Sequence, residues 1–185
     1  EDECDRLGRA NITPVTGVNR HCTLASALGH IQRLDDQSGA KHRQVLAVIR
    51  HPFSLEYSFY RHLQKPHIAE RRRRTSPELI ELAKGDFKTV VARAGYHRQG
   101  LRQEDYFLID DKLPQNVRLV RYEELADSFP QVVKTAVSAL RNIPFPHLNS
   151  SGANALDLEA LLDAELRQLL YEKHRYLFDQ GYYRA

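Results

Sequence analysis

Arg50 and Ser58 are the residues whose types and spacing most directly indicate a binding site. A guanidinium donates paired hydrogen bonds to an anionic oxygen group, and a serine hydroxyl can add one more. Arg50 follows the apolar run Val45–Ile49. Ser58 belongs to a helical pattern, Ser54–Leu63, that follows this run. If the helix folds back toward the strand, both groups converge on the crevice where open α/β sheets bind ligands, and they suit a phosphate dianion.

Tyr122 is a further candidate because it follows a second apolar run, Val117–Val120. An aromatic ring at the carboxyl end of a strand is well placed to stack on a nucleotide base. A tyrosine packed in the core explains the same pattern equally well. We interpret the adjacent Glu123 as structural rather than catalytic.

Strands and helices in alternation must position these residues. The run Val45–Ile49 predicts a strand buried on both faces, as in a parallel sheet, and Pro52 ends it because proline cannot donate to the ladder. The next helix places Leu55, Phe59 and Leu63 on one face. Further helical patterns cover Thr23–Leu34, Pro77–Leu82, Asp86–Ala94, Pro130–Leu140 and Leu156–Phe178. We interpret Arg71–Arg74 as a solvated loop, or else as a basic flap near an anionic sugar or cofactor.

Length and charge limit the classes of function. The 185 residues fit one domain, 1–185, in which residues 1–19 form a loop-like leading segment. The net charge of +3 fits an anionic ligand but is far below that of a dedicated nucleic-acid-binding protein. There is no apolar run long enough for a membrane span. Cys4 and Cys22 form no metal-binding pattern, and a reduced compartment, the cytoplasm, is favoured over the Golgi lumen.

Several motifs together resemble one enzyme family. The segment Arg50–Phe53, followed by Ser58 and Tyr60, resembles the Arg-x-Pro-aromatic and Ser-x-Tyr signature of sulfotransferases that use 3′-phosphoadenosine 5′-phosphosulfate. Arg121–Leu125 is similar to the strand end of the same family, and Leu148–Ser151 is similar to its Leu-Asn-x-Ser segment. The motifs occur in the family's order, which makes the combination more specific than any one of them.

The resemblance implies both a fold and an activity. The fold would be an α/β three-layer sandwich with a central parallel sheet, related to P-loop NTPases. The activity would be transfer of a sulfuryl group from 3′-phosphoadenosine 5′-phosphosulfate to a hydroxyl of a carbohydrate, without a metal ion. Arg50 and Ser58 would hold the 3′-phosphate, and Tyr122 would flank the adenine.

His21 would be the catalytic base by the same resemblance. Carbohydrate sulfotransferases have a histidine at the start of a helix before the Arg-x-Pro strand, and His21 precedes Thr23 and Leu24 in a similar setting. Imidazole titrates near neutral pH and can accept the proton of an attacking hydroxyl. The alternative is a surface or helix-capping histidine, one of nine in the chain.

One motif of the family is missing. Sulfotransferases begin with a Pro-Lys-Thr-Gly loop whose amides and lysine bind the 5′-phosphosulfate, and the nearest match, Pro14–Asn19, has valine in place of lysine. The chain does not begin with methionine, and we expect the true loop to lie upstream. A decayed loop would instead indicate a non-catalytic nucleotide- or glycan-binding domain of the same fold. A nucleic-acid-binding module that uses Arg71–Arg74 is a third possibility, disfavoured by the modest net charge.

Overall fold

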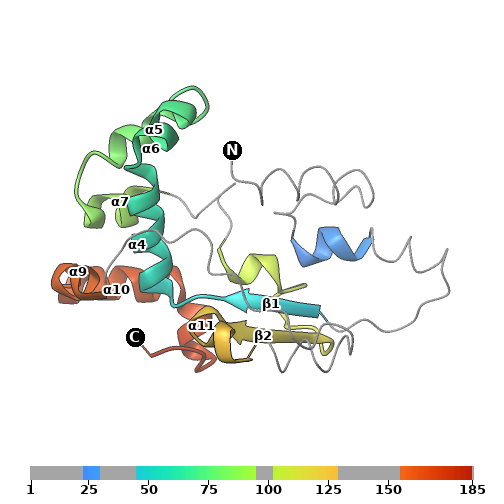
Figure 1. Cartoon of the computed structure of the whole chain (residues 1–185). Helices are drawn as coiled ribbons and strands as arrows, with labels where there is room; N and C mark the ends of the chain where they lie inside the picture. Colours follow the sequence, from blue (N-terminus) through green and yellow to red (C-terminus); the bar gives the residue numbers. More distant parts are fainter. Residues whose placement is uncertain (1–22, 30–44, 95–101, 129–154, 185) are drawn as a thin grey trace. The chain divides into compact units, whose positions relative to one another are not determined.

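A computed structural model describes residues 23–29, 45–94, 102–128 and 155–184. Its elements in chain order, whose α-helices and strands Figure 1 labels, are β1 (Val45–Ile49), α4 (Pro52–Leu63), α5 (Pro66–Arg72), α6 (Pro77–Leu82), α7 (Phe87–Arg93), η1 (Glu104–Tyr106), β2 (Val117–Arg121), η2 (Tyr122–Glu124), α9 (Ala155–Leu161), α10 (Ala164–Lys173) and α11 (Arg175–Asp179). None of the helices in these ranges has the length and apolar character needed to cross a bilayer. The following predicted features lie outside the described residues: the segment 1–19 with Pro14–Asn19, His21, the helix Pro130–Leu140, and Leu148–Ser151.

The chain divides into two compact units. Unit 1 comprises residues 1–47 and 103–119, and unit 2 comprises residues 48–102 and 120–185. The division passes through both strands, so the carboxyl ends of β1 and β2 belong to unit 2. The predicted single domain over 1–185 stays a prediction.

The two strands pair in parallel, as the apolar runs predict. Burial on both faces of β1 was a wrong prediction. Ile49 is fully buried, but Leu46 is 38% exposed and Val48 is 52% exposed. The reason is that no described element covers the face of β1 that carries Leu46 and Val48, whereas a sheet between two helical layers would bury both faces. The three-layer sandwich therefore stays a prediction.

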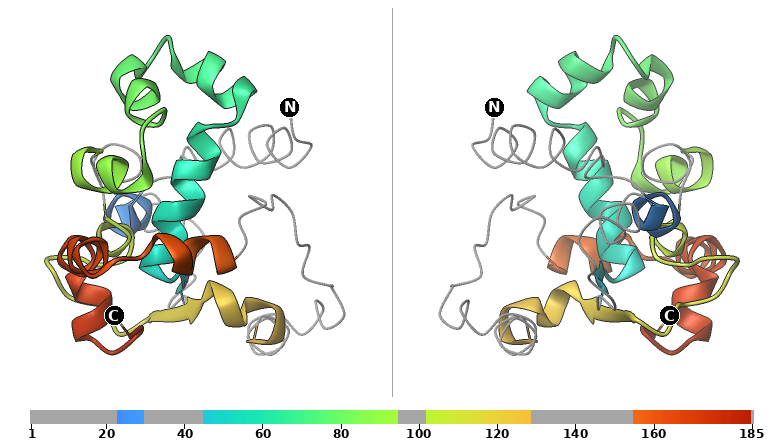
Figure 2. Two further views of the ribbon diagram at one scale, coloured as in Figure 1. Left: turned by 90° about the vertical axis from the view of Figure 1, so that its left-hand side faces the viewer. Right: turned by 90° about the vertical axis from the view of Figure 1, so that its right-hand side faces the viewer.

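Helix α4 begins at Pro52, two residues before the predicted start. Pro52 occupies the first helical position, where its missing N–H costs nothing, and His51 has the extended conformation of an N-cap. The buried face carries Phe53, Phe59 and Leu63 at helical spacing. The helix leads from the end of β1 to α5 and α6 (Figure 1 and Figure 2).

Three short helices follow α4 and pack against it. The prediction of a loop at Arg71–Arg74 is wrong for its first two residues, because α5 extends through Arg72. Pro66 starts this helix, and Ile68 anchors it by burial. Pro77 starts α6 as predicted, although the side chain of Ser76 makes no capping bond. Asp86, the first residue of the next predicted pattern, caps α7 through its side chain. A core cluster joins these elements: Phe59, Leu63, Ile80 and Ala83.

The C-terminal pattern Leu156–Phe178 forms three helices rather than the one long helix predicted. Asp163 interrupts it because its side chain caps α10, accepting a hydrogen bond from the Leu166 N–H at 2.7 Å. His174 stands between α10 and α11 with non-helical dihedral angles. The chain leaves α11 at Gly181, which has φ of +71°, and the Tyr182 N–H bonds the Leu177 carbonyl at 3.1 Å.

Unit 1 contains a helical turn and a hairpin. Thr23 caps the helix at residues 24–29 through its hydroxyl, 3.2 Å from the Ser26 nitrogen, as its position predicts. Between η1 and β2, Asp110 and Asp111 both have positive φ, and the chain reverses there with Ile109 bridged to Lys112.

Candidate functional site

Arg50 and Tyr122 lie together at the carboxyl ends of the two parallel strands. The guanidinium carbon of Arg50 is 5.0 Å from the centroid of the Tyr122 ring, a cation–π distance. Arg50 is half-buried, whereas Tyr122 is 37% exposed. The pair offers a charged hydrogen-bond donor beside an accessible aromatic ring, so a ligand that combines an anionic group with a flat ring fits its chemistry.

Glu123 joins the two strand ends to the C-terminal segment. One carboxylate oxygen accepts the backbone N–H of His51 at 2.8 Å. The other accepts the hydroxyl of Tyr183 at 2.9 Å, and that hydroxyl also lies 3.2 Å from the Ile49 carbonyl oxygen. Burial, together with the charge of Glu123, raises the pKa of Tyr183, so its hydroxyl stays neutral. These contacts agree with a structural role for Glu123.

His51 fixes the turn between Arg50 and α4. Its Nδ1 accepts the backbone N–H of Phe53 at 3.3 Å, which assigns the ring proton to Nε2. The ring packs edge-on against Tyr183, with centroids 4.9 Å apart. Burial lowers the pKa of His51, and the charge of Glu123 only partly offsets this effect. A neutral imidazole that caps a helix is a structural group.

Ser58 lies on α4, beyond the turn that follows Arg50. It is half-buried and lies six residues beyond Pro52 on α4, which corresponds to about 9 Å along the helix axis. Among the described residues, no hydrogen bond joins Ser58 to Arg50. The fourth predicted residue, His21, lies outside the described residues. The structure thus brings together two of the four predicted site residues.

A buried charged network was not predicted from the sequence. Glu56, which is 4% exposed, accepts a hydrogen bond from His174 Nε2 at 2.8 Å, and Lys173 Nζ lies 3.2 Å from the same oxygen. Lys173 also reaches the Ala94 carbonyl at 3.4 Å, so the network joins α4, α7 and α10. The available signal was the spacing of Glu56, three residues after Phe53 and three before Phe59 on the apolar face of α4.

The pKa of Glu56 reflects this network. Burial raises the pKa of the carboxyl group, but the hydrogen bond from His174 and the charge of Lys173 outweigh burial, and the pKa lies below its ordinary value. Glu56 is therefore ionised and compensated near neutral pH. We interpret it as a brace for α4 rather than as a proton-transfer group.

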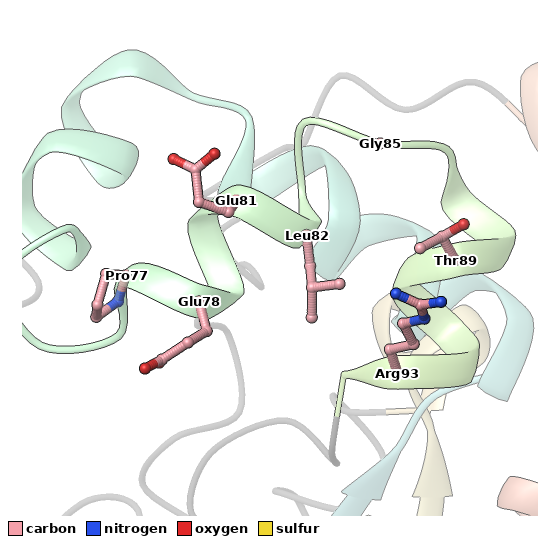
Figure 3. A pocket seen from close by; sticks show the side chains of 7 residues that line it. All are labelled: Pro77, Glu78, Glu81, Leu82, Gly85, Thr89 and Arg93. Carbon is pink, nitrogen blue, oxygen red and sulfur yellow. The ribbon is translucent and has the colours of Figure 1, made fainter.

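The described residues hold no group of three or more histidine, cysteine or acidic side chains arranged for a metal ion. They do form a hollow of about 670 Å³ between α6 and α7. Figure 3 shows Leu82 projecting into it, with Glu78 and Arg93 on different sides. Arg50, Ser58 and Tyr122 are not among the residues that line this hollow.

Comparisons with models of protein families, with curated proteins and with solved structures found no match to this chain.

Proposed function

We propose that the chain is a sulfotransferase that moves a sulfuryl group from 3′-phosphoadenosine 5′-phosphosulfate to a hydroxyl of a carbohydrate. The observation that carries the proposal is the Arg50–Tyr122 pair at the ends of adjacent parallel strands. The two residues belong to separate motifs of the sequence, and the pair supplies a donor for a phosphate and a ring for a base.

Each residue has a defined part in the proposed reaction. Arg50 binds the 3′-phosphate, and Ser58 adds a hydrogen bond to the same ligand. Tyr122 packs beside the adenine. His21 takes the proton of the acceptor hydroxyl while its oxygen attacks sulfur. The bond between sulfur and the bridging phosphate oxygen breaks, and adenosine 3′,5′-bisphosphate leaves with that oxygen.

Calorimetry on the full chain tests the binding step. Adenosine 3′,5′-bisphosphate should bind more tightly than adenosine 5′-monophosphate. Arg50→Ala should weaken bisphosphate binding by roughly 10- to 100-fold, since hydrogen bonds between charged groups contribute about 1.5–3 kcal/mol. Arg61→Ala is the matched control, because Arg61 is an exposed arginine on the same helix. Equal affinity for the two nucleotides, or equal effects of the two variants, would contradict the proposal.

Binding without catalysis is the second candidate function. It is favoured by Val15, which stands where the family's phosphosulfate loop has lysine. Transfer of labelled sulfate to a carbohydrate acceptor separates the two functions. Transfer that His21→Ala abolishes, with bisphosphate affinity retained, supports the enzyme. Tight binding with no transfer supports the non-catalytic domain.

A further inference from the structure

The positive charge of the chain is concentrated in one short stretch, Arg61–Thr75, which we call the basic segment. It contains six arginines and lysines against one glutamate, a net charge of +5. The whole chain carries +3, so all other residues together sum to −2. The basic segment therefore carries more positive charge than the net charge of the whole chain, and it can attract anions.

The four consecutive arginines of the basic segment, Arg71–Arg74, are largely accessible. Arg71 and Arg72 form the last turn of α5, and Arg73 and Arg74 follow it. Arg72 is half-buried and the other three are exposed. No ion pair of these four side chains occurs within the part of the chain that the structure describes. The C-terminal end of a helix favours one or two cations, but it does not account for four adjacent ones.

The positive groups of the basic segment also lie close together in space. The pKa of His62, at the end of α4, is lowered by burial and then by the positive charges of Arg72, Lys65 and Arg71. The pKa of Arg72 is lowered by burial and by Arg71. Helix α5 thus gathers charges from several turns into one cluster whose members repel one another, and an anion bound there would relieve the repulsion.

The chemistry around these charges excludes several classes of partner. Within the described residues, the large exposed apolar side chains are Leu46, Val48, Tyr122 and Leu161, and none belongs to the basic segment. Stable anchoring to a membrane combines a basic patch with an apolar group, and a protein partner relies on buried apolar or aromatic contacts. The segment has no phenylalanine, tyrosine or tryptophan to stack on a nucleic-acid base. Helix α5 has seven residues, which is short for a helix that reads base edges in a DNA groove.

We propose that Arg71–Arg74, with Lys65, bind the sulfate groups of a linear sulfated polysaccharide. Such a polysaccharide presents only charged and polar groups, which match the charged side chains of the segment. The planar guanidinium group of arginine forms paired hydrogen bonds with the oxygens of a sulfate.

The place of the basic segment indicates a long ligand. It lies at the end of α4 opposite to Arg50, about 18 Å away along a helix of twelve residues (Figure 1). That the bound polysaccharide is also the acceptor rests on the proposed function. In that case the basic segment supplies binding energy remote from the transferred group.

Titration of the full chain with a heparin oligosaccharide at several salt concentrations tests the inference. The double variant Arg73→Ala/Arg74→Ala should bind at least about tenfold more weakly, and its salt slope should fall by about two, one for each charge removed. The matched control is Arg167→Ala/Arg175→Ala, which removes two arginines outside the basic segment, the half-buried Arg167 and the exposed Arg175, ion-paired to Glu159 and Glu172. Equal losses in the two variants would overturn the inference.

Other polyanions decide the class of partner. Heparin stripped of sulfate, single-stranded DNA of matched charge, polyglutamate and phosphatidylserine vesicles should each bind at least about tenfold more weakly than heparin. If any of them binds as tightly as heparin and with the same dependence on Arg73 and Arg74, the sulfated polysaccharide is the wrong partner.

The same variants separate this inference from the proposed function. The Arg73/Arg74 double variant should retain its affinity for adenosine 3′,5′-bisphosphate, and Arg50→Ala should retain its affinity for heparin. Heparin binding without bisphosphate binding rejects the proposed function and leaves the inference standing. Bisphosphate binding without heparin binding rejects the inference alone.

Discussion

Glu56 shows how a single charged residue can be integral to the core of unit 2. It lies on the buried face of α4, and its partners Lys173 and His174 come from the C-terminal half of the chain. A buried carboxylate is tolerated only when cations and hydrogen bonds compensate its lost hydration. The network therefore holds α4 in place against α10.

Removing the Glu56 carboxylate should be strongly destabilising. Glu56→Ala leaves the positive charge of Lys173 buried without its carboxylate, and we expect a loss of about 3–5 kcal/mol in the free energy of unfolding. Glu56→Gln should cost less, because the amide oxygen still accepts the hydrogen bond from His174. Urea unfolding measures both, with the exposed Glu78→Ala on α6 as the control. A loss from Glu56→Ala as small as that from Glu78→Ala would show that the network adds nothing.

At the scale of elements, the start of α4 depends on a neutral histidine. His51 caps the helix through Nδ1, which can accept a hydrogen bond only while the ring is unprotonated. Its backbone N–H is held by Glu123. Since Arg50 precedes this cap directly, the position of the candidate site depends on the same turn.

Acid should weaken this cap. The pKa of His51 lies below its ordinary value of 6.5, so the unfolded chain takes up the proton at a higher pH than the folded chain. The contribution of the neutral His51 ring to the free energy of unfolding is complete above about pH 6.5, and it is lost as the pH falls below that value. Unfolding by urea between about pH 7.5 and about pH 5.5 should show this decline in wild type.

His51→Asn is the matched variant for the pH experiment. Asparagine is a good N-cap and does not titrate in this range. The decline in stability should therefore be smaller in His51→Asn than in wild type, with His62 contributing the remainder in the same direction. An identical decline in the two proteins would exclude His51 as its source.

Local signals predicted most of the described helices and their ends. Thr23 and Pro77 mark helix starts and Gly181 marks a helix stop, because each acts through its own backbone or through a bond to a near neighbour. Patterns of leucine were less reliable, since Asp163 interrupts a helix that the apolar spacing alone would continue. A capping side chain can thus outweigh hydrophobic periodicity.

Contacts between distant segments could not be predicted in the same way. Glu56 and His174 are 118 residues apart, and no spacing rule pairs them. The exposure of Val48 depends on what covers β1, which an apolar run does not specify. For the candidate site, the sequence selected Arg50 and Tyr122 separately from their places after apolar runs, and the pairing of β1 with β2 brings them together.

At the scale of the whole molecule, charge and shape place two different features at the two ends of α4. The Arg50–Tyr122 pair lies at the start of the helix, and the basic segment begins in its last turn. The pair suits one phosphate and one ring, whereas the basic segment suits repeated negative charges along a chain. A polysaccharide held by the basic segment must be extended to reach a nucleotide bound at the Arg50–Tyr122 pair, and a single sugar is too short to span the roughly 18 Å length of α4.

His62 should report on occupation of the basic segment. Positive charges from Arg72, Lys65 and Arg71 contribute to its lowered pKa, so a bound polyanion that screens them should raise that pKa. By linkage, a heparin oligosaccharide should then bind more tightly as the pH falls through the pKa of His62. Nuclear magnetic resonance of the histidine rings, with His62→Gln for assignment, measures the midpoint with and without heparin. His51, at the other end of α4, should keep its midpoint, and an unchanged His62 midpoint at saturating heparin would place the polysaccharide elsewhere.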